Sequence, residues 1–539
     1  MTLFLGRRAL PAAAISALMA VLVGSPAASA APPEPPRLLP GDASAASARS
    51  DRDTWIVGSR PVAESRRIAR SHGARSVGDG SWVTARPRAR GLADALDAAG
   101  LLTYSEPNRL AERRQAVAPD PLSPQAAWRD VVADPALTPP PVTPDSPLLA
   151  LIDSALDPSH PEVAGSNTTS AGGQPLTDSH GTATATVAAA PQNGVGMVGI
   201  WPGMRALNLP VPAEIRCSDS SRNINAAVAA GAKVINMSYG STSPCFAEYE
   251  QLQLATRAGV TLVAAAGNEF ADGNPLEFPA SLPHVLTVAA IGPDFKPSFF
   301  SNANAAVDLS APGEGILTGA PVAFDADGTP DGYEAVSGTS FAAPMVSAVA
   351  AWIRAARPEL SPDQVAQVVR LGARDIGKRG WDANTGFGVA SVSGSLARKA
   401  PPRDPAEPND DIVWVDGRAF GKAAPRLWSG RGTAKRFGLL DRFEDPVDVF
   451  RVSLPPRSAS RVTVRSRGGD PDLAVVPGAA KRLFRARLIA RSRNEGRRTE
   501  TVTLRNPSRR SRSVYVVTYV HAGSKSLDAA YDLTIRRSR

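Results

Sequence analysis

The sequence predicts an α/β fold organised around a doubly wound, mostly parallel sheet, with an α+β unit before it and an all-β sandwich after it. Three observations predict this order. Apolar strand-like runs alternate with helical segments across residues 148–371, as in parallel sheets that carry helices on both faces. Residues 53–110 read as a β-α-β-α-β unit. Residues 447–535 hold spaced strand-like runs without a helical period, which is typical of an antiparallel sandwich.

Residues 1–30 have the pattern of an export signal. Arg7 and Arg8 precede an apolar stretch over residues 9–23, and Ala28-Ser29-Ala30 supplies a small-residue cleavage site. A short membrane anchor is the alternative, but the stretch is too short to span a bilayer stably. Because no later run approaches about 18 apolar residues, we expect a secreted, extracellular protein with no transmembrane segment in its mature form.

The two cysteines of the chain, Cys217 and Cys245, fit an oxidising compartment. An even pair in a secreted protein predicts one disulfide. Two buried, unpaired thiols are the alternative.

The segment before the central domain divides into a linker and a small folded unit. Residues 31–50 are rich in proline, alanine and serine, which indicates a linker. The unit that follows is expected to have strands at 53–57, 81–85 and 101–107, and helices at 62–71 and 92–99.

The central domain is expected to begin with a buried strand at residues 148–153. This run is wholly apolar until it ends in Asp153, as in strands buried on both faces of a parallel sheet. Further strands are expected at 204–211, 233–238, 260–266 and 285–291, and helices at 224–230, 246–257 and 362–371.

Ser340 stands where a polar stretch runs into an apolar helical segment, residues 341–353. This predicts a hydroxyl held in the first turn of a buried helix. Pro344 fits such a start because amides of the first turn have no partner within the helix. Taken alone, Ser340 could be a simple helix cap.

A serine hydroxyl becomes a nucleophile only when a base takes its proton and a carboxylate orients that base. His180 follows a polar turn that enters a helix of small residues, and Asp153 lies at the carboxyl end of its strand. In open α/β sheets, ligands bind at this end of the strands. The order Asp153, His180, Ser340 is the order found in subtilisin.

Five blocks of sequence then resemble the subtilase family of secreted serine proteases, in family order, between residues 145 and 398. They are Ala150–Ser154, Ser179–Thr182, Val234–Gly240, Ala264–Glu269 and Gly338–Pro344. The resemblance implies a serine endopeptidase that cleaves protein or peptide substrates through an acyl-enzyme and requires no cofactor for its chemistry. A catalytically inactive subtilase-like binding protein, acting through its basic C-terminal domain, is the alternative.

The resemblance also implies roles for other residues. Asn268, in isolation a turn residue, would donate to the oxyanion together with the Ser340 amide. Ser238-Tyr239-Gly240 would pair with the substrate as an added strand, with Tyr239 lining side-chain pockets, although ordinary strand-end packing is the alternative. Glu277 resembles the foot of the S1 pocket, where an acid would favour a basic residue before the scissile bond.

Two positions depart from the family pattern. Ala155 replaces a usual glycine, which would cost about 1 kcal/mol if the backbone required a positive φ. Ala183 replaces a usual second histidine, which affects local packing more than chemistry. A structural calcium ion is possible, but the sequence assigns it no ligands.

The expected domains are a signal peptide (1–30), a linker with a ferredoxin-like inhibitory propeptide (31–118), a subtilisin-like catalytic domain (119–400) and a β-sandwich accessory domain (401–539). The propeptide follows from the resemblance, and maturation would cut between about residues 108 and 123. A ferredoxin-like binding domain retained in the mature protein is the alternative.

The C-terminal domain carries the basic charge of the chain. Residues 401–539 hold 29 Lys and Arg against 15 Asp and Glu, whereas the net charge of the whole chain is only +9. The domain resembles the pre-peptidase type of accessory domain on secreted bacterial peptidases. Its arginines could form an ordinary solvated surface or bind an anionic cell-wall polymer. A specific nucleic-acid partner is not expected because aromatic residues are sparse.

Overall fold

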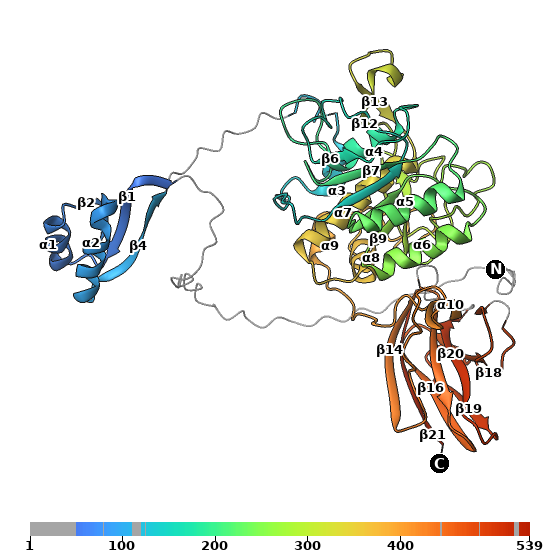
Figure 1. The fold of residues 1–539 in the computed structure, drawn as a ribbon. Helices are drawn as coiled ribbons and strands as arrows, with labels where there is room; N and C mark the ends of the chain where they lie inside the picture. The colour runs from blue at the N-terminus through green and yellow to red at the C-terminus, as the bar shows by residue number, and fades with distance from the viewer. Residues whose placement is uncertain are drawn as a thin grey trace, which may run out of the picture. The chain divides into compact units, whose positions relative to one another are not determined.

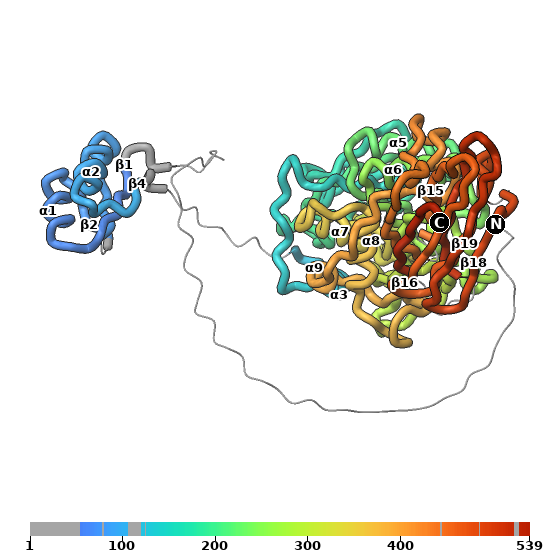
Figure 2. The backbone as a smooth tube through the Cα atoms, turned by 90° about the horizontal axis from the view of Figure 1, so that it is seen from below, coloured from blue at the N-terminus to red at the C-terminus, as the bar shows by residue number. Residues whose placement is uncertain are grey.

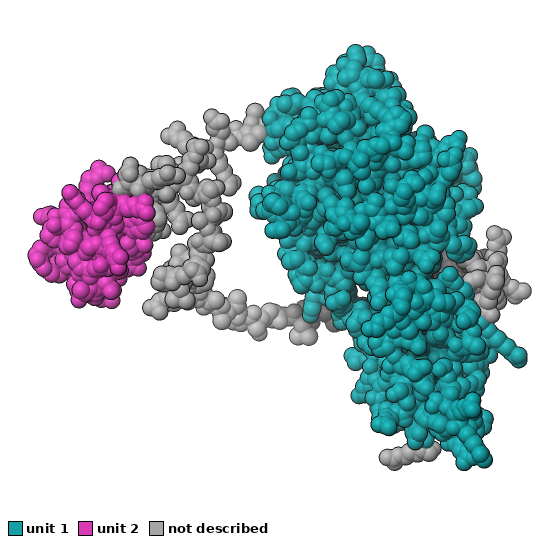
Figure 3. Space-filling model, viewed as in Figure 1, with its two compact units in different colours: residues 1–7, 117–539 teal, residues 8–116 magenta. Residues whose placement is uncertain are grey.

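The computed structural model describes residues 50–78, 80–109, 120–123, 125–441, 445–483, 486–521 and 528–538. The expected signal peptide and most of the linker lie outside the described residues. The described chain falls into two compact units (Figure 3), one holding residues 50–109 and the other holding the residues from 120 onward.

The N-terminal unit is a four-stranded antiparallel sheet with two helices. Its elements are β1 (Ser50–Ser59), α1 (Ala63–Ser71), β2 (Arg75–Gly78), β3 (Ser81–Ala85), α2 (Arg86–Ala98) and β4 (Leu102–Arg109), and the strand order is β2-β3-β1-β4. Val57, Trp82 and Leu92 form its core with both helices. The strand β2 was not predicted from the sequence, because its described residues are exposed and show no apolar alternation.

The second unit is built on a sheet of seven strands. They are β5 (Leu149–Asp153), β6 (Thr168–Ser170), β7 (Ala206–Pro210), β8 (Val234–Met237), β9 (Thr261–Ala265), β10 (Val285–Ile291) and β11 (Leu309–Pro312). The order is β11-β10-β9-β8-β5-β7-β6, and every neighbouring pair is parallel. This confirms the doubly wound parallel sheet.

Helices cover both faces of this sheet (Figure 1). The main ones are α4 (His180–Ala189), α5 (Cys217–Ala229), α6 (Phe246–Arg257), α7 (Thr339–Ala356) and α8 (Pro362–Leu371). Leu149 and Leu151 of β5 face the core that α4, α7 and α8 close. Ala150 and Ile152 face the opposite core, under α5 and α6. Alternate residues of one buried strand therefore serve two cores, which explains why the run is apolar throughout.

The carboxyl ends of three central strands meet at one edge of the sheet. Asp153 ends β5, Ser238 follows β8, and Asn268 follows β9. Helices α4 and α7 carry His180 and Ser340 in their first turns and pack against each other. Helix α7 also packs against α8, as Figure 2 shows. Residues far apart in the chain are thereby gathered beside the strand ends.

Smaller elements complete this part of the unit. They are α3 (Trp128–Ala133), the pair β12 (Ile316–Gly319) and β13 (Tyr333–Val336), a 3-10 turn at Val322–Phe324, and α9 (Val392–Ala397). Among the described residues, no helix is both long enough and apolar enough to cross a membrane.

The C-terminal part is a sandwich of two antiparallel four-stranded sheets, as predicted. One has the order β14-β21-β16-β19 and the other β15-β20-β17-β18. The bounds are β14 (Thr433–Asp441), β15 (Val447–Leu454), β16 (Ser458–Gly468), β17 (Pro471–Pro477), β18 (Ala490–Ser492), β19 (Glu500–Asn506), β20 (Arg512–Val520) and β21 (Asp528–Arg537). A short helix, α10 (Ile412–Val415), precedes them.

Ionic contacts around buried Arg370 and His284 join this sandwich to the part built on the seven-stranded sheet. Arg370 of α8 is 2% exposed, and its Nη1 lies 2.6 Å from Asp441 Oδ2 of β14. Its Nη2 lies 3.3 Å from Asp528 Oδ1 of β21, and burial raises the pKa of Asp528 to about 7. His284 Nδ1 lies 3.0 Å from Asp363 Oδ1 of α8, and His284 Nε2 lies 3.0 Å from Asp410 Oδ2, which precedes the sandwich. These contacts hold the sandwich against α8.

Candidate active site

Asp153 lies buried at the end of β5, 4% exposed, and three donors surround its carboxylate. The Ser154 N–H donates to Oδ1 at 2.8 Å, and the Thr184 hydroxyl donates to Oδ2 at 2.9 Å. The third partner is His180, whose Nδ1 lies 2.6 Å from Oδ1. A carboxylate held this way fixes the orientation of the imidazole ring and favours the tautomer with hydrogen on Nδ1.

His180 is the first residue of α4, and its ring lies between Asp153 and the first turn of α7. Burial is the largest single influence and lowers the pKa of His180, but the charge and hydrogen bond of Asp153 outweigh it, so the pKa is raised. The ring centroid lies 5.4 Å from that of Phe341, the residue after Ser340. The structure thus brings Asp153 and His180 together and sets His180 against the helix turn that carries Ser340.

Ser340 is the second residue of α7 and is half-buried. Its hydroxyl donates to the Ser238 carbonyl oxygen at 3.3 Å. Its own amide lies in the first helical turn, where N–H groups have no acceptor within the helix.

Pro344 lies deeper in α7 than the sequence analysis expected. The helix begins at Thr339, so Pro344 is beyond the first turn, and the N–H that it lacks would have bonded the carbonyl of Ser340 four residues earlier. The Ser238 hydroxyl replaces that donor, at 2.8 Å from the Ser340 carbonyl oxygen. Two hydrogen bonds, one donated by each serine hydroxyl to the carbonyl oxygen of the other, thus join Ser238 at the end of β8 to Ser340 in the first turn of α7.

Asn268 follows Gly267, whose φ of 102° requires glycine. The Asn268 Oδ1 accepts from the amide and the hydroxyl of Thr339, at 2.9 and 3.0 Å. These bonds orient the side-chain amide, and Nδ2 has no hydrogen-bond partner within the described part of the chain. An oriented donor beside the first turn of a helix is the arrangement that an oxyanion requires.

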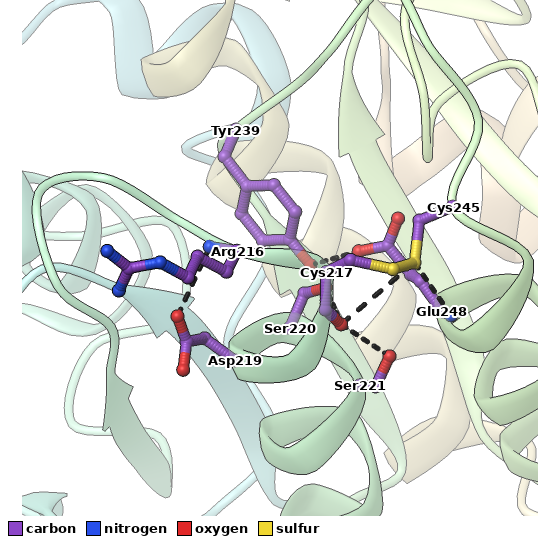
Figure 4. The surroundings of a disulfide bond; sticks show 8 residues. All are labelled: Arg216, Cys217, Asp219, Ser220, Ser221, Tyr239, Cys245 and Glu248. Atoms are coloured by element: carbon purple, nitrogen blue, oxygen red, sulfur yellow. Dashed lines mark hydrogen bonds between the residues drawn. A yellow bond between two sulfur atoms is a disulfide. The ribbon is translucent and has the colours of Figure 1, made fainter.

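The segment Ser238-Tyr239-Gly240 directly follows β8. The Tyr239 hydroxyl donates to Glu248 Oε1 at 2.9 Å, so the end of its side chain points toward α6. Figure 4 shows the ring beside the disulfide that joins Cys217 to Cys245. This bond confirms the predicted pairing and links the first turn of α5 to the cap of α6. The lining of side-chain pockets by Tyr239 stays a prediction.

Glu277 is 5% exposed and lies against the two backbone segments that flank the site. A Cβ placed on Gly240 would lie 2.6 Å from Glu277 Oε2, and one on Gly267 would lie 2.6 Å from its Cγ. Burial raises the pKa of Glu277 to about 7, and the charge of Glu269 adds to this effect. The carboxyl is therefore close to Ser238–Gly240 and to Asn268, and it changes charge near neutral pH.

Two alanines that depart from the family pattern fit the structure without strain. Ala155 is 6% exposed, and its φ is not positive. The energetic cost expected for an alanine with a positive φ therefore does not apply to Ala155. Ala183 is fully buried in the core beneath α7.

Some residues that hold the site were missed by the sequence analysis. Thr184, fully buried, supplies a donor to Asp153. Asp178 accepts from the Ser154 hydroxyl and from the His180 amide, the latter at 3.0 Å, and the Ser154 Oγ accepts from Gly181 N at 2.8 Å. An aspartate two residues before a helix start is a turn signal that could have identified Asp178. No local pattern marks Thr184.

A group of carboxylates that could hold a cation lies away from this site, at the junction with the sandwich. Ligand atoms of Asp404, Glu407 and Asp448 lie within 4.8 Å of one another. Asp448 is fully buried and its Oδ1 has no partner within the described chain; the same holds for Asp404 Oδ2 and Asp410 Oδ1. Burial raises the pKa of Asp448 to about 8 and that of Asp404 to about 6. Crowded carboxylates of this kind need a proton or a cation, and an all-oxygen set suits Ca²⁺.

Comparisons with known proteins find relatives among subtilisin-like serine proteases. A probable subtilase-type serine protease of Deinococcus radiodurans is 33% identical over 225 residues, which are 39% of this chain and 31% of the relative. Fervidolysin of Fervidobacterium pennivorans is 30% identical over 304 residues, 49% of this chain and 43% of the relative. This chain thus spans less than half the length of these two relatives. The crystal structure of fervidolysin aligns at 19% identity over 84% of this chain and 85% of its own, with a TM-score of 0.48.

A shorter relative is covered more fully. Subtilisin of Bacillus pumilus is 32% identical over 227 residues, which are 40% of this chain and 80% of the relative. The subtilase family profile matches residues 145–388, a range that holds Asp153, His180, Asn268 and Ser340. The chain belongs to the subtilase family, whose members are subtilisin-like serine proteases.

Proposed function

We propose that this chain is a secreted serine endopeptidase that hydrolyses peptide bonds through an acyl-enzyme, with Ser340 as nucleophile, His180 as base and Asp153 as the group that orients His180. The observation that carries the proposal is the 2.6 Å contact between His180 Nδ1 and the buried Asp153 carboxylate, beside the helix turn that carries Ser340. The contact makes His180 Nε2 the nitrogen available to accept a proton.

In the proposed reaction, the substrate backbone pairs with Ser238–Gly240 as an added strand. Ser340 Oγ attacks the scissile carbonyl while His180 Nε2 takes its proton, and the imidazolium that forms is stabilised by Asp153. The oxyanion accepts from Asn268 Nδ2 and from the Ser340 amide. His180 then protonates the leaving amine. A water molecule, deprotonated by His180, releases the acid product from Ser340.

The decisive test is labelling with a serine-directed phosphonate, which forms a covalent bond only with an activated serine. We expect the matured protein to be labelled and the Ser340→Ala variant to remain unlabelled. Labelling that is absent from the wild-type protein would favour the alternative, a catalytically inactive subtilase-like protein that binds through its basic C-terminal domain.

We further propose that the unit of residues 50–109 is an inhibitory, ferredoxin-like propeptide removed during secretion. The order β1-α1-β2-β3-α2-β4 supports this, because it is the split β-α-β order of ferredoxin-like units. The expected cleavage region falls largely on residues 110–119, which lie outside the described residues. Mass spectrometry of the secreted protein would give both termini, and a mature N-terminus before residue 50 would contradict the proposal.

Glu277 is proposed to favour lysine or arginine before the scissile bond. A buried carboxyl with a pKa near 7 gains charge as the pH rises, so the basic preference should strengthen between pH 6 and pH 8. A peptide library varied at this position should show the preference in the wild-type protein and its loss in Glu277→Gln. A wild-type profile with no basic preference would remove Glu277 from this role.

We also propose that a structural calcium ion is held by Asp404, Glu407 and Asp448, and that the chemistry needs no cofactor. The unpartnered oxygen of Asp448, which is fully buried, supports the placement. Such an ion would neutralise carboxylates of the sandwich near its junction with the catalytic part.

Finally, we propose that the C-terminal domain attaches the protein to an anionic cell-wall polymer.

A further inference from the structure

The two sheets of the C-terminal sandwich differ in what covers their outer faces. On the sheet β15-β20-β17-β18, Val449, Val476 and Val517 face outward, and Ile412 and Val415 of α10 pack over them. On the sheet β14-β21-β16-β19, the outward side chains of Asp441 and Asp528 at one end contact Arg370 of α8, and the other described outward side chains are exposed or half-buried. Beyond this junction with α8, the second sheet presents a bare face to solvent.

The strand register arranges this bare face in rows of arginine and threonine. Arg461 of β16 lies opposite Arg536 of β21 on one side and Thr503 of β19 on the other. The next row places Thr463 between Thr534 and Thr501. Side chains directly opposite each other on neighbouring strands are about 5 Å apart at Cβ. Guanidinium and hydroxyl donors therefore alternate over a continuous surface.

The charge of this face is strongly one-sided. We call it the arginine face and define it by its six cationic side chains, Lys435, Arg461, Arg465, Arg467, Arg505 and Arg536. Away from Asp441 and Asp528, which contact Arg370 at the junction, Asp532 is the one carboxylate among the described outward residues of these strands, and its Oδ2 lies 2.8 Å from Arg467 Nε. Like charges placed opposite each other, as Arg461 and Arg536 are, destabilise a sheet.

Several guanidinium groups of the face have no ionic partner of their own. Within the described chain, Arg461, Arg505 and Arg536 make no salt bridge and no side-chain hydrogen bond. Their planar forks are free to take two oxygens of a phosphate at once, which a point charge such as lysine cannot do. The neighbouring threonine hydroxyls can donate to further oxygens of the same ligand.

The chemistry of the face also discriminates between polyanions. Phe437 is the one aromatic residue among its described outward side chains, and it is half-buried. Proteins that hold single-stranded nucleic acid combine a basic groove with several aromatic rings on which bases stack. This face has the charge without the rings, which favours a polymer that carries phosphate but no bases.

We infer that the arginine face binds a linear poly(polyol phosphate), a phosphate-bearing polymer of the cell-wall type. The polymer would lie along the cross-strand row that contains Arg461 and Arg536 and along the neighbouring rows. The inference rests on the proposed attachment to an anionic polymer and gives it a surface and a ligand chemistry. It is independent of the peptidase reaction.

The experiment measures binding of the full chain, carrying Ser340→Ala to prevent self-digestion, to purified poly(glycerol phosphate) at several salt concentrations. The test variant combines Arg461→Gln, Arg505→Gln and Arg536→Gln. The control combines Arg491→Gln, Arg493→Gln and Arg498→Gln, which removes the same charge from exposed residues of the same domain outside this face. Oligo(dT) and poly(glutamate) serve as comparison polymers.

We expect the test variant to lose at least tenfold in affinity at low salt, while the control stays within about threefold. The slope of log K against log salt should fall by about 2 in the test variant, since each phosphate contact of a flexible strand contributes about 0.7. A third variant with lysine at the three tested positions keeps the charge but loses the fork, and its affinity should be intermediate. Equal melting temperatures of test and control variants ensure that loss of binding is not loss of fold.

Each contrary outcome overturns a defined part of the inference. No binding by the parent chain would refute polymer attachment itself. Equal losses in test and control variants would refute the arginine face while leaving attachment in place. Tighter binding to oligo(dT) than to poly(glycerol phosphate) would replace the proposed ligand with nucleic acid, and equal binding to poly(glutamate) would refute recognition of phosphate.

Discussion

Thr184→Val should impair catalysis, although Thr184 is not among the residues proposed to contact the substrate. Its hydroxyl is one of three donors to the buried Asp153 carboxylate, at 2.9 Å from Oδ2. A hydrogen bond to a charged group contributes about 1.5–3 kcal/mol, which corresponds to roughly 10- to 100-fold in rate if the whole bond acts on the transition state. Because Ser154 and His180 still hold Oδ1, we expect the lower end, about a 10-fold loss in kcat/KM.

The same substitution should move the pH profile in a defined direction. His180 accepts a proton only when neutral, so activity rises with pH through the pKa of His180, which Asp153 already raises. Removing a donor leaves the negative charge of Asp153 less compensated, so its attraction for the protonated imidazole grows and the pKa of His180 rises further. The acid limb of kcat/KM should therefore shift to higher pH in Thr184→Val.

The assay is hydrolysis of a chromogenic peptide from pH 5 to pH 9, with enzyme concentration set by active-site titration. Thr184→Ser keeps the hydroxyl and serves as the matched control, and it should stay near the wild-type rate. The reasoning is refuted if Thr184→Val retains kcat/KM within twofold and its acid limb does not move.

Three further predictions concern the oxyanion donor, the cation and the junction. Asn268→Ala should lower kcat by about 10²–10³ with little change in KM, because the donor acts mainly on the transition state; stopped-flow or steady-state kinetics would show it, and a change confined to KM would contradict it. Removal of calcium with a chelator should lower the melting temperature of the wild-type protein but not that of Asp448→Asn, and equal responses would exclude Asp448 as a ligand. Arg370→Met should leave buried carboxylates without a cation and cost about 3–5 kcal/mol, seen in scanning calorimetry as a fall on the order of 10 °C, whereas Lys296→Met, which breaks the exposed pair with Asp294, should change little.

The sequence was sufficient to predict the elements whose burial follows a simple pattern. The limits of β10 and α6 match their predictions. β10 is an almost wholly apolar run, and α6 repeats Tyr249, Leu252 and Ala255 at helical spacing, so each pattern has one plausible reading. The strands β2 and β14 were missed because the described residues of β2 are exposed and β14 mixes exposed polar residues with few buried ones, so that only pairing with neighbours makes them strands.

The parts of the site that involve contacts across the fold could not be predicted in the same way. Placing Pro344 in the first turn was wrong, because its missing donor is supplied by Ser238, more than a hundred residues earlier. The predicted disulfide was confirmed, since only one pairing was available to two cysteines. The acidic group of Asp404, Glu407 and Asp448 escaped notice because its members are brought together by β15 packing against the segment before α10.

The junction around Arg370 has a consequence for how processed forms of this protein would behave. Asp441 and Asp528 belong to strands at opposite ends of the sandwich sequence, and both contact the same guanidinium, while Asp410 reaches His284 separately. A nick within residues 398–403 would therefore sever the polypeptide without parting its two halves. Denaturing electrophoresis would resolve two bands, whereas gel filtration in native buffer would still return a single peak.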